Sequence, residues 1–178
     1  QDDIKEKLAF EKTGKTFRKS FNRPNLVYAI SHTDDKYAGM LYALKKAPGT
    51  AIIYARNRRQ TKELSDWLNH ENISATFYHA GLSPKVKDVR QTDWLNNKVR
   101  VMVATNAFGM GIDKPDVRLV LHAGIPESLE AYYQEAGRAG RDGKKAFAVS
   151  LVNEADLVQL ERNFEIQFPE IKATINPY

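Results

Sequence analysis

The chain has 178 residues, of which 42% are hydrophobic and 28% are charged, with a net charge of +5. This length suits one domain with a substantial core, and no apolar run is long enough to span a bilayer. The absence of cysteine excludes disulfides and thiolate metal sites, and the four histidines are too scattered in sequence for a zinc site.

Residues 1–23 are polar and are predicted to form a linker or packing arm that ends at Asn22, Arg23 and Pro24. Within them, residues 9–16 (AFEKTGKT) match a loose phosphate-loop pattern in which Ala replaces the first Gly. A phosphate loop needs a buried strand before it and a helix that begins at its Lys. Neither flank fits, because DDIKEKL favours a helix and Pro24 interrupts any following helix. We interpret the match as coincidental.

From Asn25 onward, short apolar runs alternate with amphipathic segments. The apolar runs predict strands at 26–30, 51–55, 74–78, 99–104, 119–123 and 147–152. The amphipathic segments predict helices at 34–46, 59–69, 84–95, from Ser128 towards Arg138, and at 155–166. Strands separated by such helices require crossover connections. The sequence therefore predicts an α/β fold over residues 24–168, a three-layer α-β-α sandwich with a mostly parallel central sheet, followed by a tail at 169–178.

Polar or glycine-rich segments follow four of the predicted strands, at 56–58, 79–81, 105–115 and 124–127. In open parallel sheets, ligands bind outside the carboxyl ends of the strands. We therefore expect these segments to share one edge of the sheet and to form one surface for an anionic ligand. The positive net charge also favours a polyanionic partner.

The segment at 104–118 (ATNAFGMGIDKPDVR) carries groups suited to a phosphate. Gly109 and Gly111 permit a turn that directs amide N–H groups at an anion, and the Thr105 hydroxyl can donate to a phosphate oxygen. Asp113 would repel phosphate, so it is predicted to accept from a ribose hydroxyl or to orient an arginine. The alternative is a structural loop in which Met110 and Ile112 pack inward.

Residues 128–145 (SLEAYYQEAGRAGRDGKK) combine a helix with a glycine-rich turn. Ser128 is a suitable N-cap, and Arg138 and Arg141 lie three residues apart in the turn. The planar guanidinium fork matches phosphate oxygens two at a time, and glycine allows the backbone to approach closely. The alternative is an ordinary helix C-cap followed by a solvated basic turn.

The segment IIYARNRRQTKEL places Arg56 and Arg58 directly after a buried strand, where they can contact the phosphates of a polynucleotide. The alternative is a solvated helix start. His79, in YHAGLSP, is predicted either to meet a phosphate or to cap the helix at Pro84.

In this order and spacing, IIYARNR, YHAGL, VMVATNAFGMGIDKPDVR and SLEAYYQEAGRAGRDG closely resemble the motifs of the second RecA-like lobe of RecQ-family DNA helicases, from about residue 17 to 151. The resemblance implies a RecA-like fold and an ATP-dependent 3′–5′ DNA helicase, with ATP in a cleft between two lobes. It implies that Arg141 is the arginine finger, that Arg138 is its partner on the phosphates, and that Gln134 couples phosphate state to lobe closure. Asp113 and Gly111 would lie at the nucleotide, and the implied contacts to the DNA strand are Arg56, Asn57, Arg58, His79, Thr105 and Asn106.

A strand-borne phosphate loop, a DExH-type box, the first-lobe DNA-sensing loop and the zinc-binding cysteines of this family do not occur in these residues. We therefore expect an excised second lobe, inactive alone, whose partners are the first lobe and single-stranded DNA. ATP and Mg²⁺ would be bound mainly by the first lobe, with no zinc in this fragment. The expected setting is cytoplasmic, at the bacterial nucleoid, in DNA repair and recombination, without secretion or a membrane. The alternatives are an RNA helicase lobe of the same superfamily and a non-catalytic nucleic-acid-binding module.

Overall fold

Six parallel strands form one sheet in the computed structural model, which describes residues 7, 22–109 and 111–167. The order is β1-β6-β5-β2-β4-β3, and all five pairings are parallel. The predicted α/β fold is confirmed. The strands are β1 (Leu26–His32), β2 (Thr50–Tyr54), β3 (Ala75–Tyr78), β4 (Val101–Ala104), β5 (Val117–His122) and β6 (Ala146–Val152).

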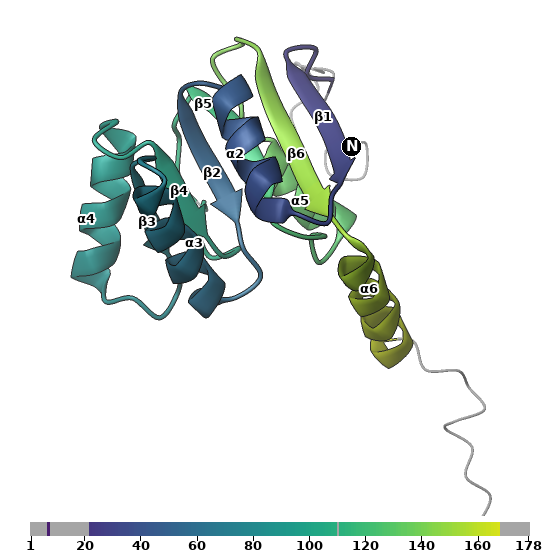
Figure 1. Cartoon of the computed structure of the whole chain (residues 1–178). Helices are drawn as coiled ribbons and strands as arrows, with labels where there is room; N and C mark the ends of the chain where they lie inside the picture. The colour runs from purple at the N-terminus through teal and green to yellow at the C-terminus, as the bar shows by residue number, and fades with distance from the viewer. Residues whose placement is uncertain (1–6, 8–21, 110, 168–178) are drawn as a thin grey trace, which may run out of the picture.

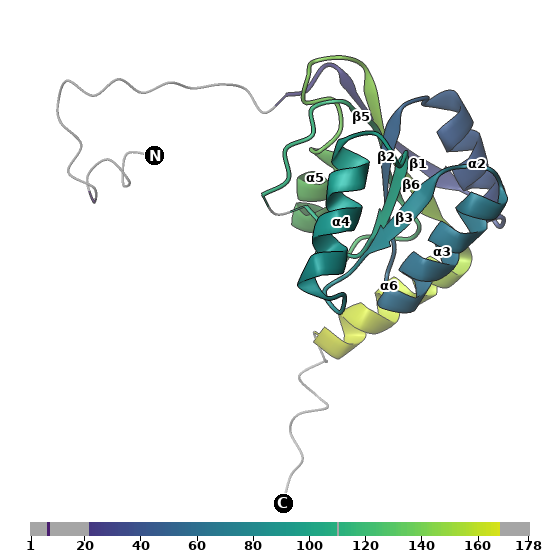
Figure 2. The ribbon, with the colours of Figure 1, turned by 90° about the vertical axis from the view of Figure 1, so that its left-hand side faces the viewer.

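Helices cover both faces of the sheet, which gives the three predicted layers (Figures 1 and 2). Helices α2 and α3 lie on one face, and α4 and α5 lie on the other. The helices are α2 (Lys36–Lys46), α3 (Arg58–His70), α4 (Pro84–Leu95), α5 (Leu129–Ala136) and α6 (Glu154–Gln167). The match at residues 9–16, Met110 and the tail lie outside the described residues, as does most of the predicted linker.

Polar side chains fix where three of these helices begin. Asp35 accepts from the amide of Ala38, Asn57 from that of Gln60, and Ser128 from that of Ala131. Each cap satisfies an amide that has no partner within the helix, which is why the helices begin directly after these residues.

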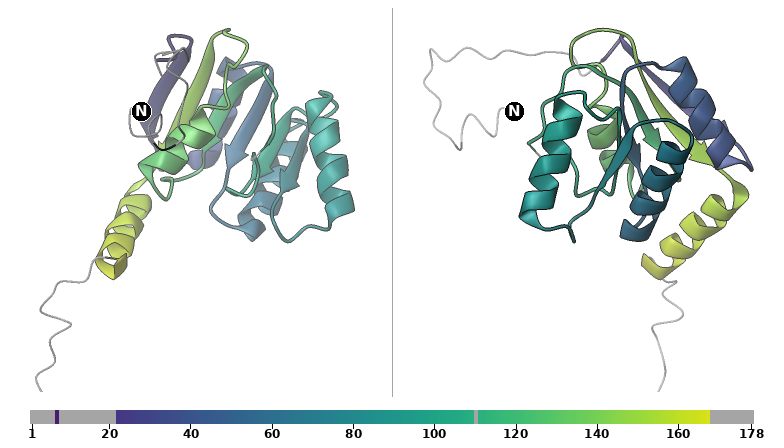
Figure 3. Two further views of the ribbon diagram at one scale, coloured as in Figure 1. Left: turned by 180° about the vertical axis from the view of Figure 1, so that it is seen from behind. Right: turned by 60° about the vertical axis from the view of Figure 1, so that its left-hand side comes forward.

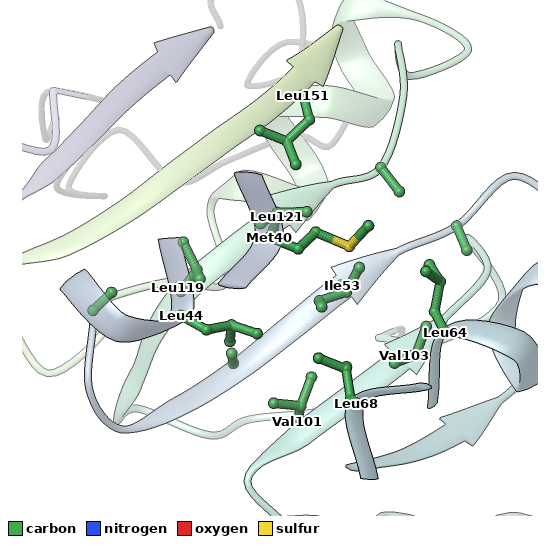
Figure 4. Close-up of a cluster of buried hydrophobic side chains, with 14 residues drawn as sticks. Met40, Leu44, Ile53, Leu64, Leu68, Val101, Val103, Leu119, Leu121 and Leu151 are labelled. Carbon is green, nitrogen blue, oxygen red and sulfur yellow. The ribbon is translucent and has the colours of Figure 1, made fainter. Parts of the chain in front are cut away.

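Alternating strand residues build a separate core on each face of the sheet. Ile53 and Val103 point towards α2 and α3, whereas Ile52 and Met102 point towards α4 and α5. Figure 4 shows the first core, in which Met40 and Leu44 of α2 and Leu64 and Leu68 of α3 meet the strands. These two cores hold the helices, and therefore the loops after the strands, in fixed positions.

Two connections determine where the functional loops lie. β4 and β5 are joined without a helix, and because the strands are parallel the connecting loop has to return to the edge at which strands begin. It crosses the face that α4 and α5 cover, where Phe108 packs against Trp94 at a ring-centroid distance of 5.4 Å. Helix α6 leaves the sheet at the end of β6 and extends beyond it (Figure 3).

Candidate functional site

The predicted site residues fall into two regions rather than along one edge. Arg56, Arg58, His79 and Thr105 follow the ends of β2, β3 and β4, at what we call the carboxyl edge, together with Asn57 and Asn106. The arginine turn (residues 137–143) lies near the opposite end of β5, because the amide of Gly140 donates to Val117 and that of Asp142 to Pro115. The expectation of a single edge is therefore wrong for Gly111 and Asp113, since the loop before β5 has to run back across the sheet.

Arg141 is held by the loop that precedes β5. Its Nη1 lies 3.0 Å from Asp113 Oδ1 and 3.2 Å from the carbonyl oxygen of Ile112. Both contacts use one nitrogen, so within the described residues Nε and Nη2 remain available to a ligand. The Arg141 side chain is 36% exposed and that of Asp113 is 82% exposed. Of the two roles considered for Asp113, the contact that orients an arginine is present, and the ribose contact stays a prediction.

Arg138 lies directly over the backbone of Gly109. Its Nη1 donates to the Gly109 carbonyl, and its buried Nε has no hydrogen-bond partner among the described residues. Gly109 has φ +127°, and a Cβ there would lie 2.2 Å from Arg138 Cζ, so only glycine leaves room for this guanidinium. Nearby, Tyr54 donates to the Phe108 carbonyl, and its burial raises the pKa of the hydroxyl, against the opposing charge of Arg138. The two arginines are thus both seated on the 108–113 loop.

Gln134 and Gly111 flank these arginines. Gln134 is exposed on α5, one turn before Arg138, and Gly111 is exposed with φ +75° and nothing within 4 Å of the position of a Cβ. Gly111 therefore leaves open space in front of the loop. The roles predicted for both residues stay predictions.

Two residues that the sequence did not single out hold the back of the arginine turn. Arg23 Nη2 donates to the carbonyls of Ala139 and Gly140 at 2.9 and 2.8 Å. Asn25 Nδ2 donates to the carbonyls of Gly140 and Lys144 at 2.7 and 2.9 Å. Both residues come from the segment before or at the start of the domain, more than 110 residues from the turn in sequence, so no local pattern could have paired them with it.

At the carboxyl edge, Arg56 and Asn57, which were predicted to contact a DNA strand, bond to other groups of the protein. Arg56 Nη2 lies 2.6 Å from Asp156 Oδ1 on α6, and the same carboxylate binds Lys36. Asn57 caps α3 with its side-chain oxygen. Asn57 therefore has a structural role at the start of α3. Contact with a polynucleotide stays a prediction for Arg56 and Asn57.

Arg58 and His79 come together at the same edge, from the start of α3 and from the loop after β3. The guanidinium of Arg58 folds over Gly81, where a Cβ would lie 2.8 Å from its Nη1. Loss of solvent, followed by the charges of Arg58, Arg90 and Lys87, lowers the pKa of His79. Since three cations surround this imidazole, the cluster has a positive field suited to an anion.

Thr105 and Asn106 line a hollow of about 260 Å³ between the carboxyl edge, α5 and α6. At its floor, His122 Nε2 lies 2.9 Å from Glu135 Oε2, and the imidazole stacks on Tyr54 with 17° between the rings. His122 is only 2% exposed. Its place at the end of an apolar strand gave no sign of this pairing, because Glu135 comes from the following helix.

Within the part of the chain that the structure describes, no group of three or more His, Cys, Asp or Glu side chains is arranged to hold a metal ion. The same part contains no helix with the length and apolar character needed to cross a membrane.

The sequence profile of the helicase conserved C-terminal domain matches residues 35–143, which include every predicted site residue. The chain belongs to this helicase C-terminal domain family. The ATP-dependent DNA helicase RecQ of Bacillus subtilis is 38% identical over 158 residues, which cover 88% of this chain and 27% of that protein. A protein of Acanthamoeba polyphaga mimivirus, provisionally named an ATP-dependent RNA helicase, is 41% identical over 155 residues, covering 86% and 28%.

Among solved structures, this helicase domain is similar to the Escherichia coli DEAD-box protein SrmB, with a TM-score of 0.67 and 27% identity over 82% of this chain and 87% of that one. The chain spans about a quarter of the length of the two curated relatives named above. The resemblance to the second RecA-like lobe of RecQ-type helicases is confirmed.

Proposed function

We propose that this helicase domain is the second motor lobe of an ATP-dependent 3′–5′ DNA helicase and that Arg141 is its arginine finger. The observation that carries the proposal is the seating of Arg138 and Arg141 side by side on the 108–113 loop, each fixed through one nitrogen. A guanidinium fixed in this way keeps further donors for phosphate oxygens and needs little reorganisation when charge develops.

The proposed chemistry is phosphoryl transfer from ATP bound between this lobe and a first lobe. The first lobe would supply the lysine and Mg²⁺ that this reaction requires. Arg141 would stabilise the charge that develops as the γ-phosphoryl group leaves, and Arg138 would bind the phosphates beside it. Gln134, exposed one turn earlier on α5, would sense the phosphates and couple them to closure of the two lobes.

The carboxyl edge would grip the backbone of a single DNA strand. Arg58, Arg90 and Lys87 form a cationic cluster around His79 there, and Thr105 and Asn106 line the adjoining hollow. Contacts to phosphate position a polynucleotide without reading its bases, as a translocating motor requires. The relatives named RecQ favour DNA, whereas the name of the mimiviral relative favours RNA as the second candidate. Unwinding assays on matched DNA and RNA duplexes separate the two.

The deciding experiment is Arg141→Ala in the full two-lobed protein. We expect kcat for ATP to fall by about 10³- to 10⁵-fold, while the affinities for ATP and DNA stay nearly unchanged. Arg141→Lys should not restore turnover, because an ammonium lacks the planar fork. Lys144→Ala, which removes an exposed cation beside the arginine turn, is the matched control and should keep full turnover. A raised KM with unchanged kcat would make Arg141 a uniform binding contact and refute the finger assignment.

The isolated 178-residue chain should hydrolyse no ATP above background, with or without single-stranded DNA. Robust turnover by the pure chain would contradict the proposal and would make residues 9–16 a working phosphate loop.

A further inference from the structure

Arg23 binds the arginine turn that follows α5. The carbonyls of such a turn are not paired within a helix or strand, so a side chain from another segment can hold them. Arg23 Nη2 donates to Ala139 and Gly140 at 2.9 and 2.8 Å, and Nη1 reaches the Gly137 carbonyl at 3.5 Å. One guanidinium therefore gathers three carbonyls of the arginine turn through two nitrogens of its planar fork.

Asn25 completes this contact two residues later. Its Nδ2 bonds the carbonyls of Gly140 and Lys144, and a Cβ on Gly140 would lie 2.6 Å from that nitrogen. The carbonyl of Asn25 in turn accepts from the amide of Ala146, at the start of β6. The backbone of the turn is thus pressed against residues 23–25, and these are themselves fixed to the sheet.

The opposite side of the same turn carries Arg138 and Arg141. Their side chains reach the 108–113 loop, whereas the carbonyls between them face Arg23. The turn is glycine-rich, with φ +62° at Gly140 and +80° at Gly143, so its own residues restrain it weakly. The position of the two arginines consequently depends on what holds the carbonyls.

We propose that Arg23 is a positioning residue for the arginine turn, which fixes Arg138 and Arg141 in the geometry that phosphoryl transfer needs. This inference rests on the proposed function, since it assumes that the turn acts on ATP. A guanidinium displaced by about 1 Å at a reacting phosphate can lower the rate by about 100-fold. Ground-state binding of ATP, which the first lobe dominates under the proposal, should change little.

The chain offers a control in Arg100, which holds backbone carbonyls at the end of α2 as Arg23 holds those of the turn after α5. Arg100 donates to the carbonyls of Leu44, Ala47 and Gly49, of which Ala47 is the C-cap residue of α2. It therefore also holds three carbonyls at a helix end, but it has no contact with the arginine turn among the described residues. Replacement of either arginine removes three bonds to carbonyls, and replacement of Arg23 also removes a long bond from its Nε to Asn25 Oδ1, at 3.5 Å.

The test measures DNA-stimulated ATP turnover of the full two-lobed protein with Arg23→Gln, Arg100→Gln or Arg141→Ala. We expect Arg23→Gln to lower kcat by about 10- to 100-fold and to change the KM for ATP by less than about threefold. Arg100→Gln should lower the melting temperature by a similar amount but change kcat by less than about twofold. Equal kcat values for the two variants, or a change in KM alone, would overturn the inference.

Two further arms keep the result decisive. If Arg23→Gln does not accumulate as folded protein, Arg23→Lys replaces it, and a wild-type kcat in that variant would overturn the forked-donor argument. If Arg141→Ala abolishes turnover and the Arg23 variants do not lower it, the inference fails while the proposed function stands. If Arg141→Ala keeps its turnover, the proposed function itself fails.

Discussion

Asp156 Oδ1 lies 2.6 Å from Arg56 Nη2, and the other oxygen of this carboxylate binds Lys36 and the amide of Asn153. One buried side chain, 3% exposed, thus ties the first turn of α6 to α2 and to the loop after β2. The arrangement makes Asp156 the point through which α6 is fixed to the carboxyl edge.

Asp156→Ala should destabilise the 178-residue chain by about 3 kcal/mol in urea unfolding, because it leaves Lys36 without its carboxylate in a largely buried position. This loss of stability should lie near the lower end of the range for broken buried ion pairs, because the Arg56 side chain is 42% exposed and can be hydrated. Glu63→Ala, which breaks an exposed pair with Arg59, is the control and should change stability by less than about 0.5 kcal/mol. Similar losses of unfolding free energy in the two variants would mean that the burial of Asp156 does not strengthen its ion pairs.

The Asp156 carboxylate also predicts that the stability of the fold decreases at acid pH. Burial by itself would raise the pKa of Asp156, but the hydrogen bonds from Lys36 and Asn153 and the charges of Lys36 and Arg56 outweigh it and lower the pKa. A carboxyl with a lowered folded-state pKa stabilises the fold above its unfolded value of about 3.9, and this contribution is lost as pH falls through the folded pKa.

We therefore expect the difference in unfolding free energy between wild type and Asp156→Asn to be constant above about pH 5 and to shrink below about pH 4. Urea titrations at a series of pH values measure it. A difference that stays constant down to pH 3 would show that the pKa of Asp156 is the same in the folded and unfolded chains. The control is Glu63→Gln, whose difference from wild type should be small at every pH.

Local patterns in the sequence were sufficient for the fold. Within the described residues, the six strands and five helices follow from apolar runs and amphipathic periods, and the cap of α5 follows from Ser128, all of which act within a few residues. The cap of α3 by Asn57 was not predicted, since that residue was expected to contact a DNA strand. The sheet has no antiparallel strand among the described residues, so it is more regular than the mostly parallel sheet predicted. Strand boundaries differ by one or two residues, as at β5, which begins at Val117 rather than 119.

The candidate site was less predictable because its key contacts join distant segments. The pairing of Arg141 with Asp113 was among the expected roles. The hydrogen bonds from Arg23 to the arginine turn and the ion pairs of Asp156, by contrast, link residues about 100 or more positions apart. The expectation of one shared edge failed for a topological reason. The loop after β4 starts at the carboxyl edge, but it has to cross the sheet so that β5 can run parallel to β4.

The cationic cluster at the carboxyl edge predicts a change in salt dependence. In the full protein, Arg58→Ala should weaken single-strand binding for all sequences alike and reduce the slope of log K against log salt by about 0.7. Arg59→Ala is the control, because Arg59 is 86% exposed and pairs with Glu63 instead of turning towards Gly81. An unchanged slope in Arg58→Ala, or a loss that depends on sequence, would remove Arg58 from the strand path.

The contact between Gly109 and Arg138 allows the proposed role of Arg138 in ATP turnover to be tested without removing any charge. A methyl group at Gly109 would lie 2.2 Å from Arg138 Cζ, and because the guanidinium is the mobile end of a long side chain, Arg138 rather than the backbone should move. Gly109→Ala should therefore lower kcat for ATP in the two-lobed protein by about 10-fold or more. Gly143→Ala is the matched control, since Gly143 also has positive φ, at +80°, but nothing within 4 Å of its Cβ position. The change at Gly143 strains the backbone by about 1–2 kcal/mol. The strain is larger at Gly109, whose φ of +127° lies outside the left-handed helical region, so the melting temperature should fall further in Gly109→Ala. If both variants lost turnover alike, the loss would come from backbone strain, and the seat of Arg138 on Gly109 would have no part in the reaction.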